Sequence, residues 1–281
     1  MTILVRHTWH GWDEVGALRL TDPAGAEIAS TPDATVLALG GASWPRVGAD
    51  GAWVGPLADV GVAITPLRPA NCGFTVQWSD SFRERFAGEP LKNVRLSFAG
   101  TAVRGEAVVT RRGIEGGAVY SLSARLRDQI DERGAAVLHV DLHPDLSAAE
   151  LEQRLRRRRP GDSQTTFNRR TTGLPPVAIA LLREARAGGL PAEPEHLAAL
   201  IKDTPMHLVG VEPLARAIST AGGVAWSAID ERFMLQSSPG VFVVGEMIDW
   251  EAPTGGYLLQ ATFSVAVAAA HGVLTWWSER S

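Results

Sequence analysis

The fold is decided by the stretch Gly240-Val241-Phe242-Val243-Val244-Gly245-Glu246-Met247-Ile248-Asp249. Four apolar residues between two glycines, 241–244, are typical of a short strand buried on both faces, as in a parallel sheet. The chain then passes Ala252-Pro253-Thr254-Gly255-Gly256 and enters an apolar helix, predicted over 257–270 with Thr254 as its N-cap. A strand that leads so directly into a helix indicates an α/β domain.

The start of that helix is a candidate ligand site. Gly255 and Gly256 bring bare backbone N–H groups to the first helical residues, Tyr257 and Leu258. Such an end carries unpaired donors and a partial positive charge, which favour an anionic or electron-rich ligand. The alternative is an ordinary strand-to-helix turn whose two acids, Glu246 and Asp249, are merely solvated.

Two further glycine pairs follow predicted strands. The strand 35–39 runs into Gly40-Gly41, followed by Ala42 and Ser43. A glycine lets backbone lie close to a ligand or adopt a φ that a Cβ forbids, although a tight turn between strand and loop has the same composition. The second pair, Gly222-Gly223, lies within Thr220-Ala221-Gly222-Gly223-Val224.

In this order the three segments resemble the FAD-binding motifs of bacterial NAD(P)/FAD-dependent oxidoreductases, the BaiN-like or aminoacetone-oxidase-family flavoproteins. The matching residues are 36–45, 220–224, and 243–246 with 253–257 and Gln260. The resemblance covers most of the chain. It implies a doubly wound FAD-binding domain interrupted by an inserted domain, and an oxidoreductase that moves hydride to or from the flavin, with NAD(P)H as a candidate electron donor.

The resemblance also implies a set of FAD-contacting residues. In the flavoproteins that this chain resembles, carboxylates form hydrogen bonds with the ribityl or ribose hydroxyls of FAD, and the helix start faces the isoalloxazine ring. The set comprises Gly40, Gly41, Ala42, Ser43, Gly222, Gly223, Gly245, Glu246, Asp249, Thr254, Gly255, Gly256, Tyr257 and Leu258. No catalytic base, nucleophile or metal-binding cluster emerges from the sequence, so the catalytic residues are unassigned and no metal is expected.

One departure from the family is large. Its members begin with strand–GxGxxG–helix, which holds the ADP pyrophosphate, and no GxGxxG occurs in this sequence. The sequence therefore predicts an incomplete, N-terminally truncated FAD-binding domain. A second hypothesis follows from the same departure: the chain is a cofactor-free or weakly binding relic, or an interaction module without activity.

Three segments are expected. Residues 1–68 and 222–281 form the split FAD-binding domain, and 69–221 form a β-rich and helical insert that begins at the Pro66–Pro69 region. Alternating patterns predict a barrel or curled sheet in the insert. Its strands are expected at 73–78, 94–98, 103–109, 135–142, 206–211 and 215–219, with a helix over 119–133 and further helices within 147–204. In the first segment a strand edge is expected at 3–5 and 8–9, and a hairpin with arms 17–20 and 27–29.

Composition limits the remaining choices. The chain has 281 residues, 45% of them hydrophobic, and a net charge of −4, which exerts no general attraction on nucleic acid or anionic membranes. The run Arg156–Arg159 is expected to be a solvated helix end. The apolar segment 257–277 is expected to be a buried helix with His271 in the core, and the single cysteine, Cys72, to be buried. We therefore expect a cytoplasmic protein with a small-molecule substrate, no nucleic-acid partner and no membrane, and with an undetermined oligomeric state.

Overall fold

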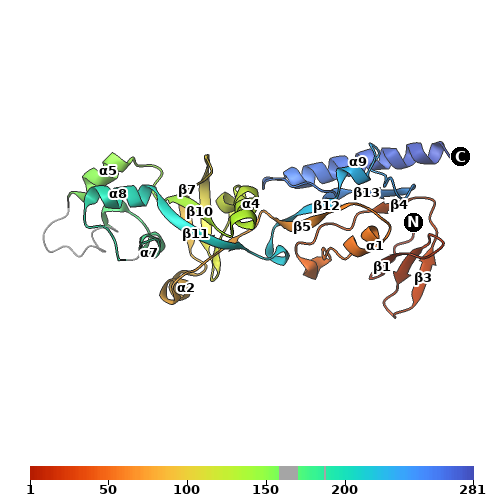
Figure 1. The fold of residues 1–281 in the computed structure, drawn as a ribbon, viewed down its shortest axis with the longest axis horizontal. Coiled ribbons are helices and arrows are strands. Elements are labelled where there is room, and N and C mark those ends of the chain that lie inside the picture. The colour runs from red at the N-terminus through yellow and green to blue at the C-terminus, as the bar shows by residue number, and fades with distance from the viewer. Residues whose placement is uncertain (158–169, 187) are drawn as a thin grey trace. The chain divides into compact units, whose positions relative to one another are not determined.

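A computed structural model of the protein describes residues 1–157, 170–186 and 188–281. The chain divides into two compact units (Figure 1). Unit 1 combines Met1–Ala70 with Leu214–Ser281, and unit 2 is Asn71–Pro213. The chain therefore leaves unit 1 once, folds unit 2, and returns.

Unit 1 contains three small sheets. An antiparallel meander consists of β1 (Thr8–Trp12), β2 (Leu18–Thr21) and β3 (Glu27–Ser30). A parallel pair consists of β4 (Thr35–Leu37) and β13 (Val241–Val243), and an antiparallel pair of β5 (Ile64–Ala70) and β12 (Ser219–Val224). The helical elements are η1 (Pro45–Val47), α1 (Val54–Asp59), η2 (Leu214–Arg216), η3 (Trp226–Ala228), η4 (Gly245–Met247) and α9 (Tyr257–Ser278).

The parallel pair β4–β13 contributes to the core of unit 1. All three residues of β13 are buried, which confirms the strand expected from the opening stretch. Leu37, Leu57, Val243 and Ile248 belong to one core cluster, which joins β4, β13, α1 and the residues after η4. In β4, by contrast, Val36 is 50% exposed. The structure shows this parallel pair; the incomplete doubly wound FAD-binding domain expected from the sequence stays a prediction.

Strand β5 runs through the Pro66–Pro69 region, where the insert was expected to begin. Its pairing with β12 shifts register between Ala221 and Gly223, which places Pro66 in the irregular part of the ladder. A proline at such a bulge removes no regular ladder hydrogen bond, so the strand can continue. The hairpin expected over 15–30 is confirmed as β2 and β3.

Three local expectations are wrong. Residues 3–5 lie outside any strand. The strand expected at 215–219 of the insert is not formed, because 214–216 are the 3-10 turn η2 and β12 starts only at Ser219. Helix α9 begins at Tyr257 as expected, but its N-cap is Gly256 with φ 88°, and no side chain caps it. Thr254 is therefore not the cap, because the left-handed residue directly before the helix already ends the loop.

The expectation that the apolar C-terminal helix is buried is also wrong. Helix α9 extends to Ser278, and only Ala269 and Gly272 among its residues are buried. His271 is exposed rather than in the core. The length and composition of α9 would allow it to cross a membrane. One face nevertheless packs on its own unit, since a Cβ at Gly272 would lie 2.6 Å from the carbonyl oxygen of Arg232.

Unit 2 is built on a closed barrel of six strands in the order β10-β11-β6-β9-β8-β7, which confirms the barrel expected for the insert. Alternation of buried and exposed residues along its strands explains why the pattern was visible in the sequence. Cys72, next to the first barrel strand, is fully buried as expected. The strands are β6 (Phe74–Val76), β7 (Pro90–Phe98), β8 (Thr101–Val109), β9 (Gly113–Glu115), β10 (Ala136–Asp141) and β11 (Thr204–Val211).

Helices complete unit 2. They include α2 (Asp80–Phe86), α3 (Gly117–Tyr120), α4 (Ser123–Arg133), α5 (Ala148–Leu155), α7 (Pro176–Glu184) and α8 (Pro194–Lys202). The single helix expected over 119–133 is thus two helices. Helix α5 starts with a capping box formed by Ser147 and Glu150. It ends at Leu155, so Arg156 and Arg157 follow a helix end as expected, while Arg158 and Arg159 lie outside the described residues.

Candidate functional site

The candidate site lies within unit 1, where the turn after β4 meets β12 and η4. The carboxylate of Glu246 joins these segments. Its Oε1 accepts a hydrogen bond from the amide of Thr220 at 2.9 Å, and its Oε2 accepts one from the amide of Gly41 at 3.3 Å. Both oxygens of this acid thus bind protein backbone, so it holds together two segments far apart in the sequence.

Thr220 completes the same junction. Its Oγ1 accepts hydrogen bonds from the amides of Ala42 at 2.8 Å and Ser43 at 3.2 Å. Thr220 itself is 1% exposed and Ser43 is 5% exposed. Four expected site residues, 41–43 and Glu246, are therefore brought together around Thr220, whose place in the motif 220–224 did not predict a role for it.

Several of the expected glycines are required by contacts between protein segments. A Cβ on Gly41 would lie 2.3 Å from Oγ1 of Thr220, and one on Gly222 would lie 2.2 Å from the carbonyl oxygen of Pro66. A Cβ on Gly223 would lie 2.3 Å from the carbonyl oxygen of Met247. These distances are below any real Cβ contact, so close packing of backbone explains the absence of side chains here.

The glycines before α9 are different. Gly256 has φ +88°, and a Cβ built on it meets no heavy atom within 4 Å. The first amide bonded back into the helix is that of Gln260, which donates to the carbonyl oxygen of Gly256. Helix geometry leaves the preceding amides, including those of Tyr257 and Leu258, without intrahelical acceptors. Open space and spare donors therefore coincide at this helix start.

The remaining expected residues make separate contacts within unit 1. Gly245 has φ +73°, and a Cβ there would contact Thr262 of α9 at 3.3 Å. The Oδ2 of Asp249 accepts the hydroxyl hydrogen of Thr65 at 2.6 Å. The carbonyl oxygen of Gly40 accepts the indole N–H of Trp53 at 2.9 Å. Thr254 is exposed in the loop before the helix.

Two features of this arrangement bear on ligand binding: the amide donors at the start of α9, and the junction that fixes the turn after β4. The start of α9 presents oriented amide donors and the positive end of a long helix to an electron-rich group, worth about 0.3–1 kcal/mol when exposed. The Glu246–Thr220 junction fixes the turn after β4 relative to η4, the element that leads toward α9. Among the described residues no group of three or more histidine, cysteine, aspartate or glutamate side chains could hold a metal ion.

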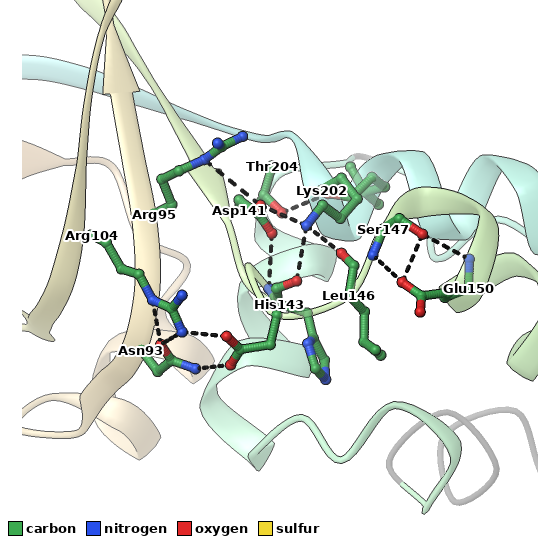
Figure 2. A network of polar contacts seen from close by, with 12 residues as sticks. Asn93, Arg95, Arg104, Asp141, His143, Leu146, Ser147, Glu150, Lys202 and Thr204 are labelled. Atoms are coloured by element: carbon green, nitrogen blue, oxygen red, sulfur yellow. Dashed lines mark hydrogen bonds and ion pairs between the residues drawn. The ribbon is translucent and has the colours of Figure 1, made fainter.

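A second polar network, in unit 2, was missed by the sequence analysis (Figure 2). Asp141 is 4% exposed on its side chain and lies 2.7 Å from Nζ of Lys202. The same ammonium donates to the carbonyl oxygens of His143 at 2.9 Å and Leu146 at 2.6 Å. Arg95 lies at 3.9 Å from the carboxylate. Lys202 thus ties the loop after β10 to the end of α8.

A neighbouring cluster fixes the same loop to the barrel. Asn93 donates to Asp145 at 2.6 Å, and Arg104 binds both Asn93 and Asp145. The hydrogen bond from Asn93, followed by that from Arg104, holds the pKa of Asp145 below its usual value. Spacing in the sequence gives no signal for these contacts, because the partners come from separate elements.

The fold defines a class: a protein whose α/β unit is interrupted by a closed barrel with attached helices. The family model for the HI0933-like protein barrel and H2TH domain matches residues 68–219, more than half of the chain. The chain belongs to the HI0933-like family.

Curated relatives extend the similarity beyond the barrel. The chain is 25% identical over 251 residues to the ribosomal RNA dihydrouridine synthase of Escherichia coli (strain K12), covering 85% of this chain and 60% of the relative. Identity to the enzyme of the same name from Haemophilus influenzae (strain ATCC 51907 / DSM 11121 / KW20 / Rd) is 26% over 247 residues, covering 84% and 59%.

A third relative has a different name. The 3-dehydro-bile acid delta(4,6)-reductase of Clostridium scindens (strain ATCC 35704 / DSM 5676 / VPI 13733 / 19) is 25% identical over 251 residues, covering 84% of this chain and 61% of the relative. The chain spans about three fifths of the length of these relatives.

Proposed function

We propose that this protein is an FAD-dependent oxidoreductase whose unit 1 receives the isoalloxazine end of the cofactor at the start of α9. The observation that carries the proposal is the open space beside Gly256, where a left-handed glycine precedes amides without intrahelical acceptors. Membership of the HI0933-like family supports the same assignment.

The residues at this helix start fit the electron-rich edge of a flavin. The amides of Tyr257 and Leu258 would donate hydrogen bonds there, and the helix dipole would stabilise the negative charge of the reduced ring. Glu246 would act indirectly, because its two oxygens already hold Gly41 and Thr220. Bound flavin would supply hydride, while the chain orients the ring and excludes water.

The names of the relatives support one kind of acceptor. Dihydrouridine arises from uridine by reduction of a C=C bond conjugated to a carbonyl group, and a delta(4,6)-reductase of a 3-dehydro steroid likewise acts on C=C bonds conjugated to a ketone. We propose that this protein reduces a small molecule with a C=C bond conjugated to a carbonyl group. NAD(P)H is the proposed source of electrons.

A uridine in RNA is the second candidate substrate. Six exposed arginines support it, all in the helical part of unit 2: Arg154, Arg156, Arg157, Arg170, Arg183 and Arg186. Exposed arginines can contact phosphate groups, and such binding weakens steeply with salt. Binding of a uridine-containing RNA that disappears in Arg154→Gln/Arg157→Gln, but persists in the control Arg19→Gln on β2, would favour this candidate over the small molecule.

Flavin content tests the proposal directly. The purified chain is expected to be yellow, or to take up added FAD with quenching of flavin fluorescence, and to release intact FAD on denaturation. The reduced complex is then expected to be reoxidised by an enone but not by the corresponding saturated ketone. Colourless protein that does not bind added FAD would overturn the proposal and favour the relic or interaction module.

A further inference from the structure

A pocket of about 290 Å³ lies within unit 2, where the outer face of β11 meets the residues after β6 and the end of α7. Along β11, Met206 and Leu208 are buried, so His207 and Val209 lie on the outer face of the barrel. Ligand pockets begin at a volume of about 300 Å³. This pocket is therefore suited to one small ring system.

A β-bulge shapes the strand side of the pocket. The pairing of β11 with β6 shifts register between Leu208 and Gly210, so Val209 is an extra residue in the ladder. A bulge bends its strand and redirects a side chain, and bulges are frequent beside active sites. Val209 is 41% exposed and lines the pocket together with Val76. The irregular ladder thus provides an apolar wall.

Three polar side chains line the pocket: Gln77, Glu184 and His207. Two hydrogen bonds fix Glu184, because its Oε2 accepts the amide hydrogen of Ser79 at 2.9 Å and its Oε1 accepts the hydroxyl hydrogen of Ser79 at 2.7 Å. A carboxylate has about four acceptor positions, so about two remain for a ligand. The side chains of Gln77 and His207 form no hydrogen bond with another residue that the structure describes.

The lining disfavours an anionic ligand. None of the described residues that line the pocket is a lysine or an arginine, whereas Glu184 is an acid. A phosphate or carboxylate group inside the pocket would be repelled by that acid with no cation to compensate. The apolar lining, which includes Val76, Leu181 and Val209, is suited to an uncharged ring. The ligand is therefore expected to be an uncharged ring that both donates and accepts hydrogen bonds.

We propose that this pocket binds the adenine ring of a nucleoside. The amino group of adenine and a neighbouring ring nitrogen form a donor–acceptor pair that a glutamine side chain matches with two hydrogen bonds, and a carboxylate can accept from an exocyclic amino group. Gln77 would bind that pair, and Glu184 would accept the second amino hydrogen. The imidazole of His207 would donate to another ring nitrogen. The pocket is in unit 2, so adenine binding there is independent of the proposed flavin site in unit 1.

Isothermal titration calorimetry of the full chain with adenosine tests the proposal. Purine riboside, which lacks the amino group, is expected to bind at least roughly tenfold more weakly than adenosine, because Glu184 and one half of the Gln77 pair lose their partner. Uridine also lacks an amino group and is expected to bind at least as weakly as purine riboside.

Two variants distinguish this pocket from any other site for adenosine. Gln77→Leu and His207→Leu are each expected to weaken adenosine binding roughly tenfold or more. Both positions are exposed, so the fold should be retained, which circular dichroism checks. The matched controls are Gln153→Leu and His196→Leu, at exposed positions of unit 2 outside the pocket, and they should bind adenosine like wild type. FAD content should be the same in all four variants.

Adenine can reach the pocket as a free nucleoside or as an unpaired base in RNA. Binding of a hexaadenylate at least tenfold tighter than adenosine, with the gain lost as salt rises, would identify RNA as the source. Equal affinities per adenine would identify the free nucleoside.

Three results would overturn the proposal. The first is no binding of adenosine at millimolar concentration to wild-type protein with native circular dichroism. The second is equal affinity of wild type and Gln77→Leu for adenosine. The third is equal affinity of the wild-type chain for adenosine and purine riboside, since the amino group would then have no partner in the site.

Discussion

The carboxylate of Glu246 accepts the amide hydrogen of Thr220 at 2.9 Å, and the hydroxyl oxygen of Thr220 in turn accepts the amide hydrogen of Ala42 at 2.8 Å. These bonds link η4, β12 and the turn after β4 into one junction. An acid that a sequence motif assigns to cofactor hydroxyls therefore has a structural partner at each oxygen. Its removal should first affect the stability of unit 1.

Replacing Glu246 with glutamine should destabilise unit 1. Glutamine keeps one oxygen, so it can accept only one of the two amides and leaves the other without its partner. The expected loss is about 1–3 kcal/mol in the free energy of unfolding, measured with urea. Glu14→Gln, which removes an exposed acid of the same unit, serves as the control and should unfold like wild type. Equal midpoints for Glu246→Gln and wild type would contradict this role.

Gly256→Val should abolish flavin binding, because the added side chain occupies the open space at the start of α9. Valine is also strained at φ +88°, so backbone strain must be separated from blockage. Gly16→Val is the matched control, since Gly16 has φ +86° and a Cβ built on it also meets no heavy atom within 4 Å. Fluorescence titration with FAD should show loss of binding in Gly256→Val and retention in Gly16→Val. Similar affinities of both variants for FAD would show that the flavin binds at another place in the protein.

Lys202→Met should destabilise unit 2 by about 3–5 kcal/mol, because it leaves the carboxylate of Asp141 buried without its ammonium partner. Lys92→Met, at an exposed position of β7, is the control. The double variant Asp141→Asn/Lys202→Met should recover much of the loss, since the buried charge is then removed as well. Urea unfolding of the three proteins measures this difference. A loss in Lys202→Met no larger than in the control would show that the pair contributes little.

The pair Arg232–Glu279 should make stability depend on pH. The hydrogen bond from Arg232 holds the pKa of Glu279 below its ordinary value of 4.5. Because the folded-state pKa is the lower one, the stabilisation is present above the unfolded-state value and is lost as pH falls through the folded-state value. The melting temperature should therefore fall less between about pH 7 and about pH 3 in Glu279→Gln than in wild type. An identical pH dependence in both proteins would contradict the assignment.

The parts of the fold that sequence predicted are those set by local pattern. Alternation revealed the barrel strands, and the glycine pair located the start of α9, because both depend on residues adjacent in the chain. The end of α9 and its exposure were not predictable in the same way. The apolar composition of 257–277 indicates that the helix packs against other apolar surface. It does not indicate how much of that surface belongs to unit 1.

Only part of the candidate site could be predicted from the sequence, because local pattern reveals segments but not the contacts between them. The segments containing Gly41 and Glu246 were identified, yet the hydrogen bonds that join them through Thr220 depend on contacts between residues far apart in the chain. The network of Asp141 and Lys202 was missed entirely, since each residue alone looks like an ordinary charged side chain.

The pairing of β5 with β12 has a consequence for how this architecture can change. Ala70 is the register partner of Ser219, so the chain leaves and re-enters unit 1 at neighbouring points of one ladder. An inserted domain such as unit 2 can be exchanged, enlarged or removed by recombination while the pairing of β5 with β12 stays continuous.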